Sequence, residues 1–343
     1  MKIVTNQTGQ TQLPDHNQMI QTVFPRLAWF RSGDLERHDI FSGPDQTLNS
    51  IGPAYLYTDR LFAVHNGELV YGRGNRKNID GQGWLFTWKD YRLAEGFAIP
   101  GMLQTNWYHF LVEFLFCGWR LQQTNPDIPI LATRVPRKGA RRDIFERFRQ
   151  QGYNLIEVDM QNRCRLVVEK LYSFNWPMYR LYYGDDENFG LFPHFCQYCR
   201  FLREEVSPAS TDAPHRLVFS TRTANDRRID PRQNELDSLF KIAGFEVVNF
   251  GEMSFEDQCR ISKESVLMVG QHGANLANML FMAPGTKVVE ISNQSIPHSA
   301  GLYNRLAPIA GLKSKHISCE DFETGSLNLL EKQIEKIVAS LNR

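Results

Sequence analysis

The chain has 343 residues, of which 42% are hydrophobic and 22% are charged, and its formal net charge is +1. This length favours two domains over one. The near-zero charge argues against a nucleic-acid binder that works through bulk positive charge. No apolar run approaches the roughly 20 residues of a membrane-spanning helix. Residues 1–18 are polar and lack the apolar core of a signal peptide, so we expect a soluble, cytoplasmic protein, with the inner face of the membrane or a removed N-terminal anchor as alternatives.

The six cysteines are scattered in apolar contexts, a pattern typical of reduced thiols in a protein core. Cys196 and Cys199 form one C-x-x-C pair, with His194 beside it. A structural zinc site usually needs a second such pair, and the sequence has none. The acidic cluster Asp185–Glu187 has the composition of a turn and predicts a solvated loop. We therefore expect no bound metal.

The first half predicts strands and helices that alternate. Residues 1–50 show no sustained periodicity and one short strand near 27–30. Asn66-Gly67, between two alternating segments at 55–65 and 68–71, predicts a hairpin. The segment Arg134–Arg149 is strongly basic, and we interpret it as a solvated helix face, with contact to an anionic acceptor or a membrane surface as the alternative. Further strands are predicted at 128–132, 153–158 and 165–172, and a helix at 191–204.

The segment FAIPGMLQTNWYHFLVEFLFCGWR contains the first candidate site. Gln104–Asn106 can cap a helix over 107–122, and His109 and Glu113 then lie one turn apart on one face. This helix is apolar on most sides, so the polar pair must be satisfied internally or face a cleft. A carboxylate next to an imidazole increases its basicity, which is how a general base is made. The alternative is a structural hydrogen bond that only satisfies two polar groups.

The segment Val206–Pro214 is rich in serine, proline and polar residues and predicts a linker between domains 1–205 and 215–343. After it the expected strands are 216–220, 245–250, 265–270 and 286–291, and the expected helices are 233–243, 253–264 with Ser254 as its cap, 297–309 and 327–341. This alternation predicts one doubly wound domain over about 215–320. The last helix either belongs to this domain or packs back on the first one.

The segment KESVLMVGQHGANLANMLFMAPGTKVVEISN predicts a strand, a tight turn over 270–274, a short helix over 275–282 and a parallel strand. Such a turn directs backbone N–H groups and the positive end of a helix dipole to the sheet edge where α/β folds bind phosphates. His272 can donate to the same anion, and Glu290 can accept from hydroxyls such as those of a ribose. In the alternative, Gly270 and Gly273 only allow a sharp turn and His272 is a surface residue.

Taken in order, the second half reads LVFSTRTANDRRI, NEL, GFEVVNFGEMSFEDQ and VLMVGQHGANLANMLFMAPGTKVVEIS, and the first half contains NWYHFLVE. This combination resembles glycosyltransferase family 61, densely over 215–293 and thinly over 100–120. The resemblance implies an α/β fold of GT-B type, with two Rossmann-like domains facing a cleft and the donor in the second. It also implies inverting transfer, commonly from a UDP-activated sugar such as N-acetylglucosamine or a pentose, and by analogy a role in cell-surface polysaccharide assembly.

Carried over residue by residue, the resemblance matches Arg222 to the family's arginine after the first strand, although Thr221 here separates it from Ser220. It matches His272-Gly273-Ala274 to the family's glycine turn and His109 to its amino-domain histidine. The further candidates are Arg227, Asn275 and Glu290 on the donor side and Asn106 on the acceptor side.

Inverting transfer needs a base for the acceptor hydroxyl and positive groups for the leaving diphosphate. The sequence has no Asp-x-Asp metal motif, so we expect cations and backbone dipoles to stabilise the diphosphate, without metal or cofactor. An arginine contact contributes roughly 1.5–3 kcal/mol, and a helix N-terminus about 0.3–1 kcal/mol. Arg222 should therefore outweigh the turn in donor binding. For the base we choose His109, supported by Glu113.

The expected partners are a nucleotide sugar and a glycan acceptor, with a peripheral membrane or lipid-linked glycan contact left open and no nucleic acid. Two rival functions remain at this stage: a UDP-sugar epimerase of GT-B shape, and a catalytically silent sugar-nucleotide-binding subunit of a glycan-assembly complex. A dehydrogenase does not fit, because Gly72-Arg73-Gly74 lacks a third glycine and a following helix.

Overall fold

The computed structural model groups the chain into two compact units, Met1–Arg137 with Phe145–Pro177, and Lys138–Ile144 with Met178–Arg343. The predicted linker 206–214 lies inside the second of these units, where Lys263 Nζ donates to the carbonyl oxygen of Pro208 at 2.6 Å. The strand expected at 27–30 and the loop at 185–187 lie outside the described residues. The structure describes residues 36–38, 48–51, 54–57, 62–65, 68–71, 89–98, 104–132, 135–158, 164–174, 192–209, 212–222, 232–292, 301–318 and 327–339.

The first unit contains a mixed sheet with the strand order β5-β4-β3-β9-β6-β7-β8. In addition, β2 pairs with β9, and β1 pairs with β2. Strands β6, β7, β8 and β9 are parallel, whereas β2 and β3 run antiparallel to β9. The hairpin at Asn66-Gly67 is confirmed, since His65 pairs with Glu68. Only the parallel part is Rossmann-like. The strands are β1 Glu36–His38, β2 Leu48–Ile51, β3 Ala54–Tyr57, β4 Phe62–His65, β5 Glu68–Tyr71, β6 Lys89–Phe97, β7 Ile130–Ala132, β8 Leu155–Glu157 and β9 Cys164–Phe174.

The helix predicted over 107–122 is confirmed, as three successive segments: α3 (Trp107–His109), the π-helical η2 (Phe110–Leu115) and α4 (Phe116–Gln122). Every residue of η2 is buried, in agreement with its apolar sequence. A π-helical turn inside an α-helix is often found at a functional site. No helix in the described part of the chain is both long and apolar enough to cross a membrane.

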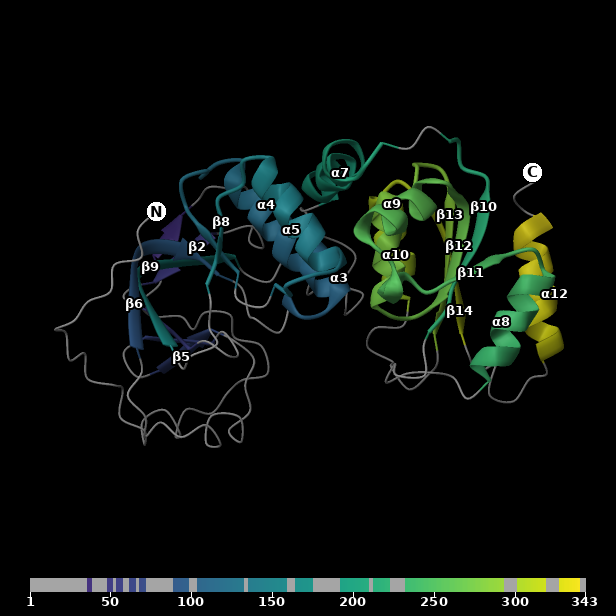
Figure 1. Cartoon of the computed structure of the whole chain (residues 1–343), viewed down its shortest axis with the longest axis horizontal. Coiled ribbons are helices and arrows are strands. Elements are labelled where there is room, and N and C mark those ends of the chain that lie inside the picture. The colour runs from purple at the N-terminus through teal and green to yellow at the C-terminus, as the bar shows by residue number, and fades with distance from the viewer. Residues whose placement is uncertain are drawn as a thin grey trace. The chain divides into compact units, whose positions relative to one another are not determined.

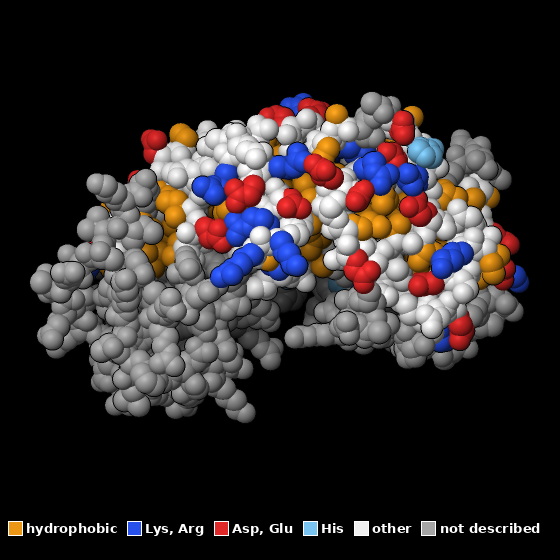
Figure 2. All heavy atoms as spheres, viewed as in Figure 1, with side chains coloured by type: hydrophobic (Ala, Val, Ile, Leu, Met, Phe, Trp, Pro, Cys, Tyr) orange, Lys and Arg blue, Asp and Glu red, His pale blue; other side chains and the backbone are white. Residues whose placement is uncertain are grey.

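The basic segment forms α5 (Ala140–Gln150), which buries Ile144, Phe145 and Phe148. Its polar side carries acidic as well as basic groups, and Arg149 donates to Glu146 at 3.3 Å. On the face shown in Figure 2, the described Lys and Arg side chains lie interspersed with Asp and Glu side chains. This mixed surface favours the solvated helix face over a patch that binds anionic surfaces.

The second unit is a five-stranded parallel sheet with the order β11-β10-β12-β13-β14, which confirms the doubly wound prediction. The edge strand β14 was not among the predicted strands. The strands are β10 Arg216–Ser220, β11 Glu246–Val248, β12 Ser265–Gln271, β13 Lys287–Ser292 and β14 Lys313–Ser318. The helices are α7 Phe192–Phe201, η3 Leu202–Val206, α8 Gln233–Ile242, η4 Phe250–Glu252, α9 Phe255–Lys263, η5 Ala274–Phe281, α10 Leu302–Ile309 and α12 Leu327–Ala339.

Helices cover both faces of this sheet: α9 and α10 lie on one face, and α8 and α12 on the other (Figure 1). The last helix, α12, packs against the sheet of the second unit. Ile334 and Ile337 of α12 are buried in one core cluster with Phe219 of β10, Phe240 of α8 and Val289 of β13. The last helix therefore completes the second unit.

The strand order reverses at β10, because β11 lies on one side of it and β12 on the other. Open α/β sheets bind their ligands at such a reversal, outside the carboxyl ends of the two strands. In this chain those ends lead into Thr221-Arg222 after β10 and into His272-Gly273 after β12. The topology thus brings together the arginine and the glycine turn that the sequence singled out separately.

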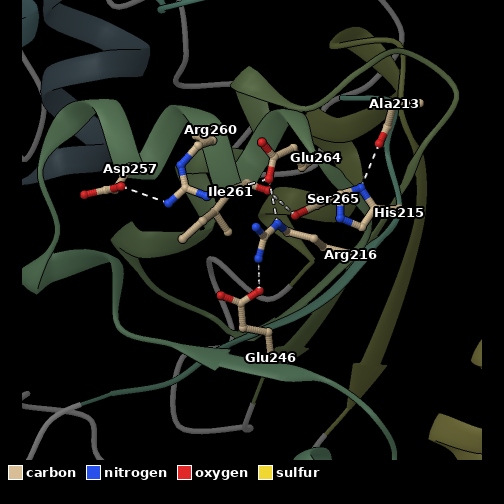
Figure 3. A network of polar contacts seen from close by, with 9 residues as sticks. All are labelled: Ala213, His215, Arg216, Glu246, Asp257, Arg260, Ile261, Glu264 and Ser265. Atoms are coloured by element: carbon tan, nitrogen blue, oxygen red, sulfur yellow. Dashed lines mark hydrogen bonds and ion pairs between the residues drawn. The ribbon is translucent and has the colours of Figure 1, made fainter. Parts of the chain in front are cut away.

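At the opposite, amino-terminal ends of β10 and β12, a polar network holds the unit together (Figure 3). Arg216 Nε donates to Glu264 Oε2 at 2.6 Å, and its Nη1 pairs with Glu246. The bond to Glu264, more than the one to Glu246, raises the pKa of Arg216. Beside them, hydrogen bonds from Arg260 and Ser254 lower the pKa of Asp257. This network connects the end of α9 to β10 and β11.

We expect Glu264→Ala to destabilise the second unit more than Glu246→Ala does. The Glu264 side chain is 4% exposed, so its removal leaves a desolvated arginine nitrogen and should cost about 1.5–3 kcal/mol. The Glu246 side chain is 41% exposed, where such pairs contribute about 0–1 kcal/mol. Differential scanning calorimetry should show a drop of several degrees for the first variant alone. Equal drops would show that exposure does not control the strength of these bonds.

Candidate active site

The first candidate site is the pair His109 and Glu113, at the junction of α3 and η2. Nδ1 of His109 lies 3.0 Å from Oε2 of Glu113. The Glu113 side chain is 1% exposed, whereas that of His109 is 27% exposed. The structure therefore confirms that the two side chains meet, with a buried carboxylate behind a partly exposed imidazole.

This contact fixes the tautomer of the neutral imidazole. An ionised carboxylate can only accept, so Nδ1 of His109 is the N–H donor. The other ring nitrogen, Nε2, then carries the lone pair and can accept a proton from a hydroxyl. Oε1 of Glu113 has no hydrogen-bond partner among the described residues. Burial raises the pKa of the nearby Cys117 thiol, and the charge of Glu113 raises it further, so this thiol is a core group and not a nucleophile.

Asn106, expected on the acceptor side, has a structural role in this conformation. Its Oδ1 accepts from the backbone N–H groups of Tyr108 at 2.9 Å and His109 at 3.5 Å. It is the N-cap of α3, as the cap prediction requires. Its amide oxygen is therefore engaged by the helix, and Asn106 contributes by fixing the start of the helix that carries His109.

The second candidate site is the turn after β12. The backbone N–H groups of Gly273, Ala274 and Asn275 have no acceptor among the described residues, whereas that of Leu276 is bonded to the Gly273 oxygen at 3.1 Å. They lie at the start of η5, which is a 3₁₀-helix and not the α-helix that the pattern suggested. Three unpaired donors at a helix start form a site for an anion.

The two glycines of this turn are needed for space. The backbone of Gly273 is extended, with φ of 172°, which any residue can adopt. A Cβ on Gly273, however, would lie 2.5 Å from Nη2 of Arg222. A Cβ on Gly270 would lie 2.9 Å from a methyl group of Leu276 and 3.1 Å from Cβ of Ser220. The alternative of a simple sharp turn therefore does not account for them.

His272 is buried, at 8% exposure, so it is not a surface residue. Its Nδ1 lies 2.6 Å from Oε1 of Glu290, and its ring meets that of Tyr303 edge-on at 5.6 Å. Arg222 donates through Nη2 to the carbonyl oxygen of His272. Arg222, His272 and the glycine turn thus meet at the end of the sheet. The other arginine of that loop, Arg227, lies outside the described residues.

The expectation that Glu290 accepts from ribose hydroxyls is wrong for this structure. Glu290 is 0% exposed, and both of its oxygens are occupied. Oε1 binds His272, and Oε2 accepts from the backbone N–H groups of Tyr303 at 3.0 Å and Asn304 at 3.1 Å. The carboxylate lies under the turn and joins it to the first turn of α10.

Sequence reasoning missed several groups around this site. The Tyr303 hydroxyl donates to the carbonyl oxygen of Gly273 at 2.6 Å, and no local pattern announces a contact across 30 residues. Thr221 Oγ1 donates to Asp237 Oδ1 at 2.7 Å, and Gln233 donates to both groups. The spacing of Gln233 and Asp237, four apart on α8, was the one available signal. These bonds anchor the residue before Arg222.

Among the described residues, no group of three or more His, Cys, Asp or Glu side chains could hold a metal ion. Cys196 and Cys199 both lie on α7 and belong to no such group. Cys196 Sγ donates to the Ile309 carbonyl oxygen, and Cys199 is fully buried, where burial raises its thiol pKa.

Comparison with known proteins finds glycosyltransferases that match part of this chain. The EGF domain-specific O-linked N-acetylglucosamine transferase of Pan troglodytes is 31% identical over 112 residues, covering 31% of this chain and 21% of the relative. The corresponding transferase of Drosophila melanogaster is 24% identical over 226 residues, covering 61% of this chain and 42% of the relative. Protein O-linked-mannose beta-1,4-N-acetylglucosaminyltransferase 2 of Canis lupus familiaris is 29% identical over 132 residues, covering 36% of this chain and 22% of the relative.

The chain thus spans between about a fifth and two fifths of the length of these relatives. The sequence model of the family described as Glycosyltransferase 61 matches residues 107–289, which is slightly more than half of the chain and includes His109, Arg222 and His272. The chain belongs to glycosyltransferase family 61.

Proposed function

We propose that this protein is an inverting glycosyltransferase that moves a sugar from a UDP-activated donor to a hydroxyl group of a glycan or glycoprotein, without a metal ion. The observation that carries the proposal is the turn after β12, where three backbone N–H groups, His272 and Arg222 converge at the reversal of strand order. A nucleotide diphosphate carries the negative charge that such a group of donors binds.

The sugar is proposed from the relatives, since three of them are named as N-acetylglucosamine transferases. UDP-N-acetylglucosamine is therefore the first donor to test. Their names also specify EGF domains and O-linked mannose as acceptors, so an O-glycan on protein stands beside the polysaccharide acceptor suggested by the sequence.

For the chemical step, His109 is the proposed base. Because Nδ1 of His109 donates to Glu113, Nε2 is the acceptor in the neutral ring. The His109 side chain is also partly exposed. Proton removal from the acceptor hydroxyl at Nε2 would accompany its attack on the anomeric carbon, while the bond to the diphosphate breaks. The GT-B architecture of the family, in which the two domains serve acceptor and donor, is part of this proposal.

The test is calorimetric titration of UDP, GDP, CMP and NAD in the presence of EDTA. We expect UDP to bind, and to bind more tightly than the other three. Tighter binding of GDP or CMP would change the donor class, and binding of UDP only without EDTA would contradict the metal-free site.

Two rival functions are separated by product analysis. A transferase releases UDP from UDP-N-acetylglucosamine when a hydroxyl acceptor is present, whereas an epimerase converts the donor without an acceptor and releases no UDP. A silent donor-binding subunit would bind UDP and transfer to none of the acceptors tested. Transfer to O-mannosyl or EGF-domain acceptors is the expected outcome.

A further inference from the structure

Among the described residues of the candidate donor site, Glu290 is a charged group that is fully buried. It is 0% exposed and engages three partners with its two oxygens. Oε2 accepts from two backbone N–H groups, those of Tyr303 and Asn304, at 3.0 and 3.1 Å. These are the second and third residues of α10 (Leu302–Ile309), and a helix start favours a negative charge. Oε1 is left for Nδ1 of His272 at 2.6 Å.

This arrangement determines where the imidazole carries its proton. Since Glu290 accepts at both oxygens, Nδ1 of His272 is the donor in that contact. A neutral imidazole has a single N–H, so Nε2 of His272 then carries a lone pair. A lone pair cannot donate to a phosphate oxygen, and it would repel one. In its neutral form His272 therefore cannot assist the N–H groups of the turn in binding a diphosphate.

We propose that Glu290 is a positioning residue that couples donor binding to protonation: when a nucleoside diphosphate binds at the turn, His272 takes up a proton from solvent at Nε2 and donates it in a hydrogen bond to a phosphate oxygen. The inference rests on the proposed function, because it requires the diphosphate at this turn. The proton adds to the Nε2 lone pair, and the resulting imidazolium lies between the carboxylate and the phosphate.

The charged and titratable groups around His272 explain why protonation accompanies binding. Glu290 of β13 favours the imidazolium, whereas Arg222, which follows β10 and bonds to the backbone of His272, opposes it. Tyr303 of α10 presents its ring edge-on and gives its hydroxyl proton to Gly273, so it adds no charge. A bound diphosphate adds negative charge beside Nε2 of His272, which shifts the balance to the imidazolium.

Titration calorimetry of UDP at about pH 8, in two buffers of different ionisation heat, measures the proton uptake directly. At that pH the terminal phosphate of UDP has lost its proton, since its second ionisation lies near about 6. The uptake therefore belongs to the protein. We expect a value approaching about one proton per UDP bound, and a dissociation constant that rises as the pH is raised further.

Glu290→Gln is the decisive variant, because the structure fixes how the amide must lie. An NH₂ group in the place of Oε2 would face two N–H donors, so the amide oxygen takes that place and the NH₂ faces His272. Nδ1 then becomes the acceptor and Nε2 carries the proton in the neutral ring. This variant should bind UDP with proton uptake close to zero. The matched control is Glu264→Gln, a buried carboxylate at the opposite end of the same sheet, in which uptake should equal that of the wild type.

His272→Asn provides a second variant should Glu290→Gln fail to fold, and it should also lose the uptake. Binding of UDP by the wild type without proton uptake overturns the inference and leaves the proposed function intact. Proton uptake that persists in both variants places the proton on another group, and this result also overturns the inference. Absence of UDP binding by the wild type overturns the proposed donor site, and the inference with it.

Discussion

His109→Ala should lower the rate of sugar transfer by about 10²–10⁴-fold, the range expected for loss of a general base. The imidazole of His109 is partly exposed, whereas the Glu113 carboxylate is buried. Nδ1 of His109 lies 3.0 Å from Glu113, so Nε2 is the ring nitrogen that can accept a proton. The variant should bind UDP as the wild type does, because the donor groups belong to the second unit. The measurements are UDP release with the acceptor that gives transfer in the wild type, and calorimetric titration of UDP.

Two further variants make this result specific. His215→Ala removes another histidine, one that is exposed and whose ring bonds to the nearby Ala213 carbonyl oxygen at 2.9 Å, and it should leave transfer unchanged. Glu113→Leu fills the buried space and leaves the imidazole unsupported, so the rate should fall by less than in His109→Ala. Transfer at the wild-type rate by His109→Ala would remove His109 from the mechanism.

Glu113→Gln is a poorer probe of the first dyad than Glu290→Gln is of the second. Oε1 of Glu113 has no partner among the described residues, so an amide at this position can turn its oxygen to His109 and preserve the tautomer. At Glu290, two backbone donors prevent that rotation. Both sites pair a histidine with a buried glutamate, and the partners of the other carboxylate oxygen determine which substitution is informative.

Local patterns predicted the elements that local chemistry controls. The helix over 107–122 follows from an apolar run with an amide at its cap, and Asn106 indeed caps it. Ser254 caps α9 by accepting from the backbone N–H of Asp257, as its position suggested. The βαβ unit around the glycine turn follows from two apolar strands separated by glycines.

Features that depend on distant contacts were not predictable in this way. The strand β14, KSKHIS, lies at the edge of the sheet and has few apolar residues, so its sequence pattern does not predict a strand. Glu290 was placed correctly at the end of β13, but its role depends on the start of α10, which only the folded chain brings to it. The domain boundary was expected at 206–214, whereas α7 and η3 bond to the end of α10 through Cys196 and Arg203.

Arg222→Ala should weaken UDP binding by about 10- to 150-fold, the equivalent of a charge-assisted contact of roughly 1.5–3 kcal/mol. The side chain lies against the turn, where it donates to the carbonyl oxygen of His272. Gly273→Ala should weaken binding in the same direction, because its Cβ would displace the guanidinium, which is 2.5 Å from that position. Arg260→Ala is the matched control: an exposed arginine at the other end of the sheet, whose loss should leave UDP affinity unchanged.

Arg222 has two roles that the alanine variant removes together: it brings a positive charge, and it holds the turn by its bond to His272. Arg222→Gln removes the charge but keeps an N–H donor, on a side chain that is two bonds shorter. If the charge is what binds the diphosphate, the glutamine variant should be nearly as weak as the alanine variant. Both variants should then show a flatter dependence of UDP affinity on salt, because screening acts on the lost charge. Wild-type affinity in Arg222→Gln would instead assign this residue to the turn, and would leave the N–H groups and His272 as the groups that meet the donor.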